Sequence, residues 1–145
     1  MAKEKPEYEV NQEFNKLAVQ IVEKYPEKFY GINIDKVRCV NIVNKERTKK
    51  AIWRIDAVKM PMALDSPFSL YVIIHSSDWN EYNDVQKLLL TADILHGIAN
   101  GDDEDTKLVP PDTKGYASMF RTFGGIDYMD DPNAPDILKK DIEWR

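Results

Sequence analysis

The sequence is poor in cysteine and in long apolar runs, and each shortage excludes a class of protein. Its single cysteine, Cys39, excludes an internal disulfide and provides none of the paired spacings of a zinc finger. One lone thiol fits a reducing compartment, so we expect a cytoplasmic protein. No apolar run approaches membrane-spanning length, and the opening MAKEKPEYEV has charge with no apolar stretch behind it. The sequence therefore predicts neither export nor membrane anchoring.

The chain also lacks an excess of basic residues. Its 20 Lys and Arg residues face 25 Asp and Glu residues, for a formal net charge of -5. Nucleic acids and anionic membranes bind basic patches, so this balance predicts that neither is the main partner. The densest acidic stretch, Gly101 to Asp105, is interpreted as a solvated loop, and less readily as a cation site or a phosphate-mimicking surface.

The residues that are present suffice for one folded unit. With 145 residues, 43% of them hydrophobic, the chain is large enough for one core and small for two, so residues 1–145 are expected to form a single domain. Apolar residues recur at helical spacing from Phe14 to Tyr25. Asn11 before this run and Pro26 after it predict where the first helix begins and ends.

Three later segments have the composition of strands. They are Val37 to Val43, Ile52 to Val58, and Phe68 to His75, which is the most hydrophobic and therefore the expected central strand. The basic stretch 44–50 is expected to join the first two strands as a turn.

A second helix is expected from about Tyr82 to Ile98, and it is apolar on nearly every side, so it should be buried. Beyond it the chain has the composition of an irregular tail with a short helix from about 116 to 123 and a last helical turn after Pro135. The order of elements predicts an α+β domain, with its helices on one face of a small, mostly antiparallel sheet of about three strands.

The stretch LLLTADILHGI on the second helix is the one that suggests chemistry. Residues four apart share a helix face, so His96 projects with Ala92 and Leu89 and is expected to face inward. Asp93 lies three residues before His96. That spacing is compatible with a carboxylate–imidazole hydrogen bond or with joint coordination of a cation.

At these residues the sequence resembles a phage-encoded family of small zincin-like metallopeptidases. The resemblance rests on the strand FSLYVIIH, the turn SSDWNEYND, the buried helix with its histidine, the opening helix from Glu13 to Pro26 and the segment LVPPDTKGYASMFRTFGG, and thus spans most of the chain. The family carries H-E-x-x-H on this helix and a His-Asp pair after a downstream proline. The resemblance implies a zincin-like fold in which three histidines bind zinc and the glutamate activates the metal-bound water.

This sequence departs from the family motif. The first histidine falls on Ala92, the glutamate on Asp93, the second histidine on His96 and the downstream histidine on Pro111, which Asp112 follows. Alanine and proline have no donor atoms for a metal. Aspartate is one methylene shorter than glutamate, which displaces the carboxylate from the position of a general base. We therefore expect a catalytically inactive protein that holds no zinc and needs no cofactor.

Two interpretations of the helix site stay open. In the favoured one, His96 faces the core and bonds Asp93 or a backbone carbonyl. In the other, Asp93, His96 and Asp112 hold zinc, manganese or iron in a shifted geometry, and the protein is a metal-dependent hydrolase with water as nucleophile. Asp112 is more simply a turn or N-cap residue, and His75 a polar residue at a strand end.

The tail offers a different kind of site. Its aromatic residues either pack on the core or leave an exposed apolar patch with an arginine, of the kind that anchors protein partners. The candidate patch consists of Met119, Phe120, Arg121, Phe123 and Tyr128. The resemblance and the broken motif together predict a pseudoenzyme in the host cytoplasm that binds a host or phage protein, with the inhibition or modulation of a host factor or defence system as its role.

Overall fold

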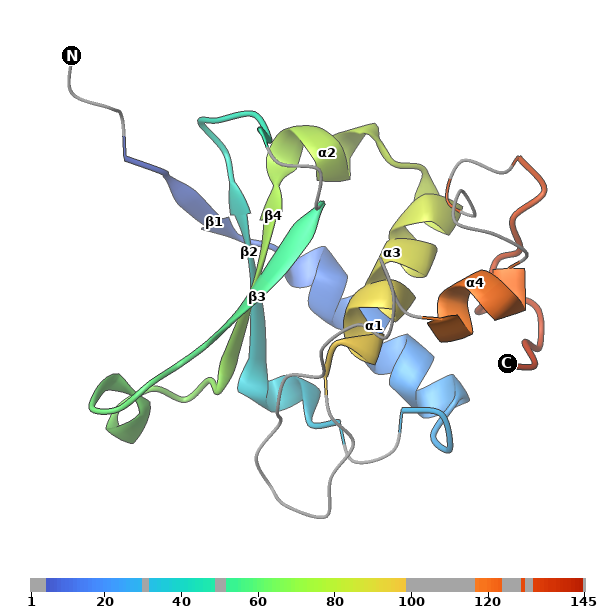
Figure 1. The fold of residues 1–145 in the computed structure, drawn as a ribbon, viewed down its shortest axis with the longest axis horizontal. Coiled ribbons are helices and arrows are strands. Elements are labelled where there is room, and N and C mark those ends of the chain that lie inside the picture. Colours follow the sequence, from blue (N-terminus) through green and yellow to red (C-terminus); the bar gives the residue numbers. More distant parts are fainter. Residues whose placement is uncertain are drawn as a thin grey trace.

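A computed structural model describes residues 5–29, 32–48, 52–98, 117–123, 129 and 132–144, without the side chains of Ala63, Ala117 and Phe120. Within these ranges the chain forms the α+β domain that the sequence predicts (Figure 1). No helix in the described ranges has both the length and the apolar character needed to cross a membrane.

Four strands form one mixed sheet in the order β1 (Tyr8–Val10), β2 (Val37–Ile42), β4 (Leu70–His75) and β3 (Trp53–Ala57). The prediction of a central Phe68–His75 strand is confirmed, because β4 lies between β2 and β3. Two pairings, β1 with β2 and β3 with β4, are antiparallel, as expected for most of the sheet, but β2 and β4 run parallel. The stretch 44–50 therefore belongs to a connection between strands that are not neighbours.

The expected count of about three strands was too low because β1 has no signal in the sequence. It is three residues long and all of them are exposed, so no alternation of apolar and polar residues marks it. It forms through main-chain pairing with β2, in which Tyr8 lies opposite Ile42 and Val10 opposite Val40.

Two long helices, α1 (Gln12–Lys24) and α3 (Asp84–His96), lie on the same side of the sheet (Figure 1). Asn11 caps α1 as predicted, since its side chain accepts a hydrogen bond from the main-chain N–H of Phe14 at 3.0 Å. Asn83 and Gln86 form a reciprocal capping box that starts α3. Both helices begin where local side chains satisfy main-chain donors that would otherwise lack partners.

Four shorter helical elements and one projection complete the described part of the fold. These are the 3₁₀ helices η1 (Ile34–Lys36) and η2 (Met62–Leu64), the helix α2 (Ser76–Glu81), where a turn was expected, and α4 (Ala117–Phe123). The connection from β3 to β4, residues 58–69, stands out from the sheet and carries η2; we call it the arm (Figure 1, lower left).

The core lies between the sheet and the two long helices. Side chains from all of these elements are 0–3% exposed: Phe14, Ala18, Ile21, Val37, Cys39, Leu70, Val72, Ile74, Leu88, Leu89, Leu90, Ala92, Ile94 and Leu95. Along β4 they alternate with Tyr71, Ile73 and His75 on the other face of the strand, where Tyr71 and His75 are partly exposed and Ile73 is 9% exposed. The prediction of a buried second helix is confirmed.

Candidate functional site

The C-terminal end of α3 places Ala92, Asp93 and His96 at the junction of the sheet, the helix layer and the C-terminal tail. Ala92 is fully buried, so the face that it shares with Leu89 points inward as predicted. The ring of His96 packs edge-on against Phe29 at a centroid distance of 5.3 Å and lies 5.6 Å from the ring of Trp144. His96 is thus surrounded by aromatic side chains.

The hydrogen bond of His96 to its own helix assigns the role of one ring nitrogen. Its Nδ1 lies 2.7 Å from the main-chain oxygen of Ala92, one turn earlier in the same helix. Because a carbonyl oxygen only accepts, Nδ1 must carry the proton and donate it. This contact agrees with the interpretation in which His96 is a core-facing residue satisfied by a backbone carbonyl.

Asp93 has a different neighbour. The indole nitrogen of Trp53, in β3, donates a hydrogen bond of 3.1 Å to Oδ2 of Asp93. This bond ties α3 to the edge strand of the sheet, whereas His96 packs toward the tail. The short side chain of Asp93 therefore serves a contact between two elements of the fold.

Zinc does not fit the residues that occupy the motif positions. Ala92 has no donor atom, Asp93 accepts a hydrogen bond from Trp53, and the family's downstream histidine is Pro111 here. Within the part of the chain that the structure describes, no three His, Cys, Asp or Glu side chains are grouped to hold a metal ion. Asp112, the third weak candidate ligand, lies outside the described residues.

Five rings meet at the end of α3 and form what we call the aromatic cluster: Tyr25, Phe29, His96, Phe123 and Trp144. Trp144 is its centre, with centroid distances of 5.4 Å to Tyr25, 5.5 Å to Phe29 and 5.6 Å to Phe123. The interplanar angles of these three pairs, 76–87°, give the edge-to-face contacts that aromatic rings favour.

The predicted binding patch in the tail is corrected at Met119. That side chain is 0% exposed and belongs to the core, because α4 turns it inward, so the prediction of Met119 as a surface anchor is wrong. Phe123 is only partly exposed and packs on Trp144, while Arg121 is exposed. The Phe120 side chain and Tyr128 lie outside the described residues.

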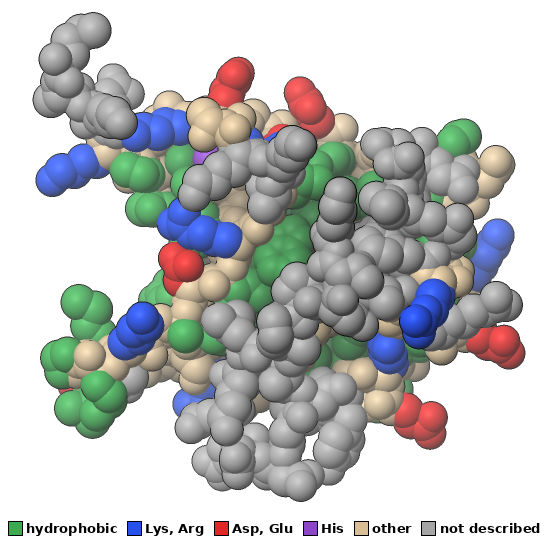
Figure 2. Space-filling model, in the orientation of Figure 1, with side chains coloured by type: hydrophobic (Ala, Val, Ile, Leu, Met, Phe, Trp, Pro, Cys, Tyr) green, Lys and Arg blue, Asp and Glu red, His purple; other side chains and the backbone are tan. Residues whose placement is uncertain are grey.

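Among the residues that the structure describes, the most exposed large apolar side chains lie on the arm, which the sequence prediction did not single out. Met60, Met62 and Leu64 are 67%, 76% and 72% exposed. Hydrophobic side chains project at the lower left of the space-filling view, where Figure 1 places the arm (Figure 2). Between the arm and Tyr71 of β4 lies an open hollow of about 630 Å³. The signal in the sequence was the apolar run MPMAL, which lies between the predicted strands Ile52 to Val58 and Phe68 to His75.

Among the described residues, two titratable groups have pKa values shifted by their surroundings, one in α1 and one in β2. The hydrogen bond from the Lys87 ammonium lowers the pKa of Glu13; partial burial opposes this shift, and the indole of Trp79 reinforces it. Burial raises the pKa of the Cys39 thiol, which keeps that side chain in its neutral, unreactive form. Neither group has the environment of a nucleophile or general base.

Comparisons with known protein families, with curated proteins and with solved structures each find no match. The resemblance to zincin-like metallopeptidases therefore stays a prediction from the sequence.

Proposed function

We propose that this chain is a non-catalytic protein that acts by binding another protein, and that the arm makes the contact. The observation that carries the proposal is the exposure of Met60, Met62 and Leu64 within five consecutive residues. Methionine is enriched at protein interfaces, where its flexible thioether adapts to the partner's surface. Burying a side chain of this size contributes roughly 1.5–3 kcal/mol, so three of them together can anchor a partner.

The arm is supported at its base, which favours recognition by a preformed element. The main-chain N–H of Val58 bonds the oxygen of Ser69 at 2.9 Å, and the N–H of Ser69 bonds the oxygen of Lys36 at 2.8 Å. The guanidinium of Arg38 stacks over the ring of Phe68, 4.3 Å from its centroid. Because its base is held by these contacts, the arm loses less conformational entropy on binding than a free loop would.

The helix site supports the non-catalytic half of the proposal. Asp93 contacts Trp53 and His96 contacts its own helix and the aromatic cluster, so the contacts of both side chains hold the fold together. On the resemblance stated above, the protein is a phage-encoded, zincin-like pseudoenzyme. Its partner would then be a host or phage protein in the host cytoplasm, and its role the modulation of a host factor or defence system.

Capture from host lysate by the immobilised protein and matched variants tests the proposal. Met62→Asp places a charge within the exposed group and should weaken capture by about 2 kcal/mol or more, the loss typical of an interface anchor. Val19→Asp is the control, because Val19 is 38% exposed on α1, away from the arm. Quantitative mass spectrometry of the retained proteins gives the readout.

Two further variants separate the arm from the other candidate surfaces. Arg121→Ala tests the exposed remainder of the tail patch, and Asp93→Ala combined with His96→Ala tests the helix site. The arm proposal predicts that both variants, once shown to be folded, retain the partner. Loss of the partner by either of them, with full retention by Met62→Asp, would assign binding to the tail or to the helix site instead.

A further inference from the structure

The last described segment of the chain is clasped by a single lysine. The ammonium of Lys24, at the end of α1, lies 3.0 Å from the main-chain oxygens of Ile137 and Leu138 and 2.6 Å from that of Lys140. Asp141 adds a carboxylate oxygen at 3.6 Å, but that side chain is fully solvated. Three carbonyls that converge on one cation make the lysine the main polar tie of this segment.

Tyr25, the next residue, makes the second tie. Its hydroxyl lies 2.7 Å from the oxygen of Ile137 and 2.9 Å from that of Lys140, and its one proton can be donated to either. The same hydroxyl oxygen accepts a hydrogen bond of 3.1 Å from the main-chain N–H of Ile142. Both ties therefore come from neighbouring side chains at one end of one helix.

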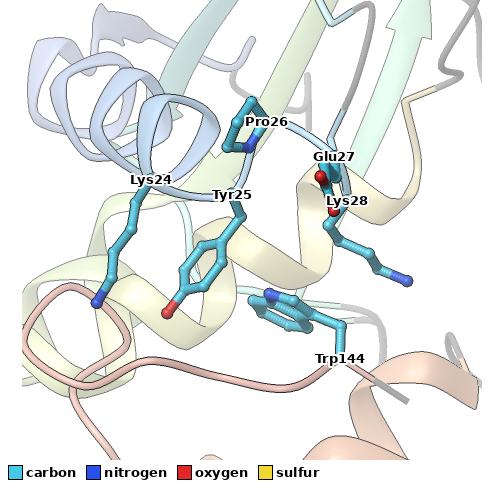
Figure 3. Close-up of a pocket in the computed structure, with 6 residues that line it drawn as sticks. All are labelled: Lys24, Tyr25, Pro26, Glu27, Lys28 and Trp144. Atoms are coloured by element: carbon cyan, nitrogen blue, oxygen red, sulfur yellow. The ribbon is translucent and has the colours of Figure 1, made fainter.

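Beyond these ties, Trp144 holds the segment through its ring alone. The indole nitrogen is buried and has no hydrogen-bond acceptor among the described residues, and a buried donor without an acceptor is energetically unfavourable. On its open side, Trp144 borders a hollow of about 580 Å³ that residues 24–28 also line (Figure 3). Figure 3 shows the indole beside the Tyr25 ring, with Lys24 and Lys28 at opposite sides of the hollow.

We infer that residues 138–144 form a releasable strap over a pocket for an aromatic side chain, with Trp144 as the occupant supplied by the chain itself. Ile137 is fully buried and anchors the strap, so release does not require the core to open. The walls that remain are the rings of Tyr25, Phe29, His96 and Phe123, which already present edges and faces to the ring of Trp144. An aromatic side chain of a partner fits the same contacts.

His96 reports whether the strap is closed, because its Nε2 atom is buried beside Trp144. Diethyl pyrocarbonate acylates accessible neutral imidazole, and the chain has one other histidine, His75, which is partly exposed and serves as the reference in the same molecule. In the unmodified protein His96 should react at least about tenfold more slowly than His75, as peptide mass spectrometry would measure.

Lys24→Met removes the clasp and keeps the length of the side chain. It should raise the acylation rate of His96 several-fold with that of His75 unchanged. Lys87→Met is the matched control, because the Lys87 side chain is similarly buried, 16% exposed against 22% for Lys24. Lys87 bonds Glu13 of α1 at 2.8 Å and forms no ion pair with the strap among the described residues. An unchanged acylation rate for His96 in folded Lys24→Met protein would overturn the inference that residues 138–144 form a releasable strap.

If Lys24→Met does not fold, hydrogen exchange in the unmodified protein tests whether the strap opens without the core. The amides of Lys140 and Ile142 should exchange at lower denaturant concentration than the amide of Leu89 in α3, since the strap opens without the core. Exchange of all three amides at one common concentration would show that the segment opens only with the whole domain, and the inference would fail.

Indole tests the chemical class of the occupant. In Trp144→Ala protein the ring of His96 is uncovered and should react faster, and indole at millimolar concentration should slow that reaction toward the rate of the unmodified protein, because it refills the place of the missing side chain. His75 again provides the reference rate. If indole leaves the rate at His96 unchanged, the pocket does not accept an aromatic group and that assignment is wrong.

Discussion

Helix α3 and the arm are both rich in apolar side chains, but those of α3 are buried and those of the arm are exposed to solvent. In α3 the residues from Leu88 to Ala92 are at most 3% exposed, whereas Met60, Met62 and Leu64 of the arm are 67–76% exposed. The family-like motif lies on the buried element, and the contacts there hold the fold together. The exposed element carries no motif. In this protein the element that carries His96 and the element with the exposed apolar side chains are therefore different.

The difference follows from where each segment lies relative to the sheet. Helix α3 crosses the covered face, so every apolar side chain that it directs toward β4 or α1 loses contact with water. The arm leaves the sheet between β3 and β4, and the other described residues leave Met62 and Leu64 of the arm 76% and 72% exposed. Exposed apolar groups of this kind typically mark an interaction site.

Truncating one leucine in each region should give the largest difference between α3 and the arm, measured as the change in the free energy of unfolding. Leu89→Ala removes fully buried atoms and should lower the free energy of unfolding by about 2–5 kcal/mol. Leu64→Ala on the arm should change it by no more than about 0.5 kcal/mol, as surface substitutions usually do. Urea unfolding measures both. A loss below about 0.5 kcal/mol for Leu89→Ala would mean that α3 turns another face toward the core.

Methionine oxidation compares the regions in the unmodified protein. Met60 and Met62 are exposed and Met119 is fully buried, so dilute hydrogen peroxide should oxidise the two arm residues at least about tenfold faster than Met119. Peptide mass spectrometry over a time course gives the rates. Equal rates at Met62 and Met119 would contradict either the exposure of the arm or the burial of α4 against the core.

The smallest expected effect concerns the ion pair between the two helices. Lys87 in α3 bonds Glu13 in α1 at 2.8 Å and lowers the pKa of Glu13. A carboxyl with a lowered pKa in the folded state stabilises the protein above its unfolded pKa, and this contribution is lost as the pH falls through the folded value. Since Glu13 is half exposed, the pair should contribute no more than about 1 kcal/mol.

Glu13→Gln tests that contribution directly. The free energy of unfolding of the unmodified protein should exceed that of the variant near neutral pH, and the two should converge as the pH falls into the range where Glu13 is protonated. Raised salt should also reduce the difference. A difference that stays constant across acidic pH would show that the carboxylate charge does not carry the effect.

Much of the framework could be predicted from the sequence because its signals are local. Asn11 and Pro26 bracket α1 as expected, and the high hydrophobicity of Phe68–His75 identified the central strand. The features that the sequence did not predict are those that depend on the rest of the fold. The strand β1 exists only through its partner β2, and the exposure of Met62 depends on what the sheet leaves uncovered.

In the candidate site, too, local features were predictable and contacts between distant residues were not. Helical spacing alone placed His96 on the inward face with Ala92, and the structure confirms that placement. The contact of Asp93 with Trp53 joins residues 40 positions apart in the sequence. The contacts of His96 with Phe29 and Trp144 join separate elements of the fold. No local sequence pattern predicts contacts of this kind. Burial of Met119 likewise depends on how α4 docks on the core.

The metal content of the protein tests the central claim most directly, which is that the end of α3 is a packing site and not a metal centre. Protein purified without chelator should carry far less than one equivalent of zinc, manganese or iron per chain when it is measured by inductively coupled plasma mass spectrometry, because Ala92 and Pro111 provide no ligand and Asp93 bonds Trp53. One equivalent of zinc that disappears in His96→Ala protein would contradict the account and support a metal-dependent hydrolase.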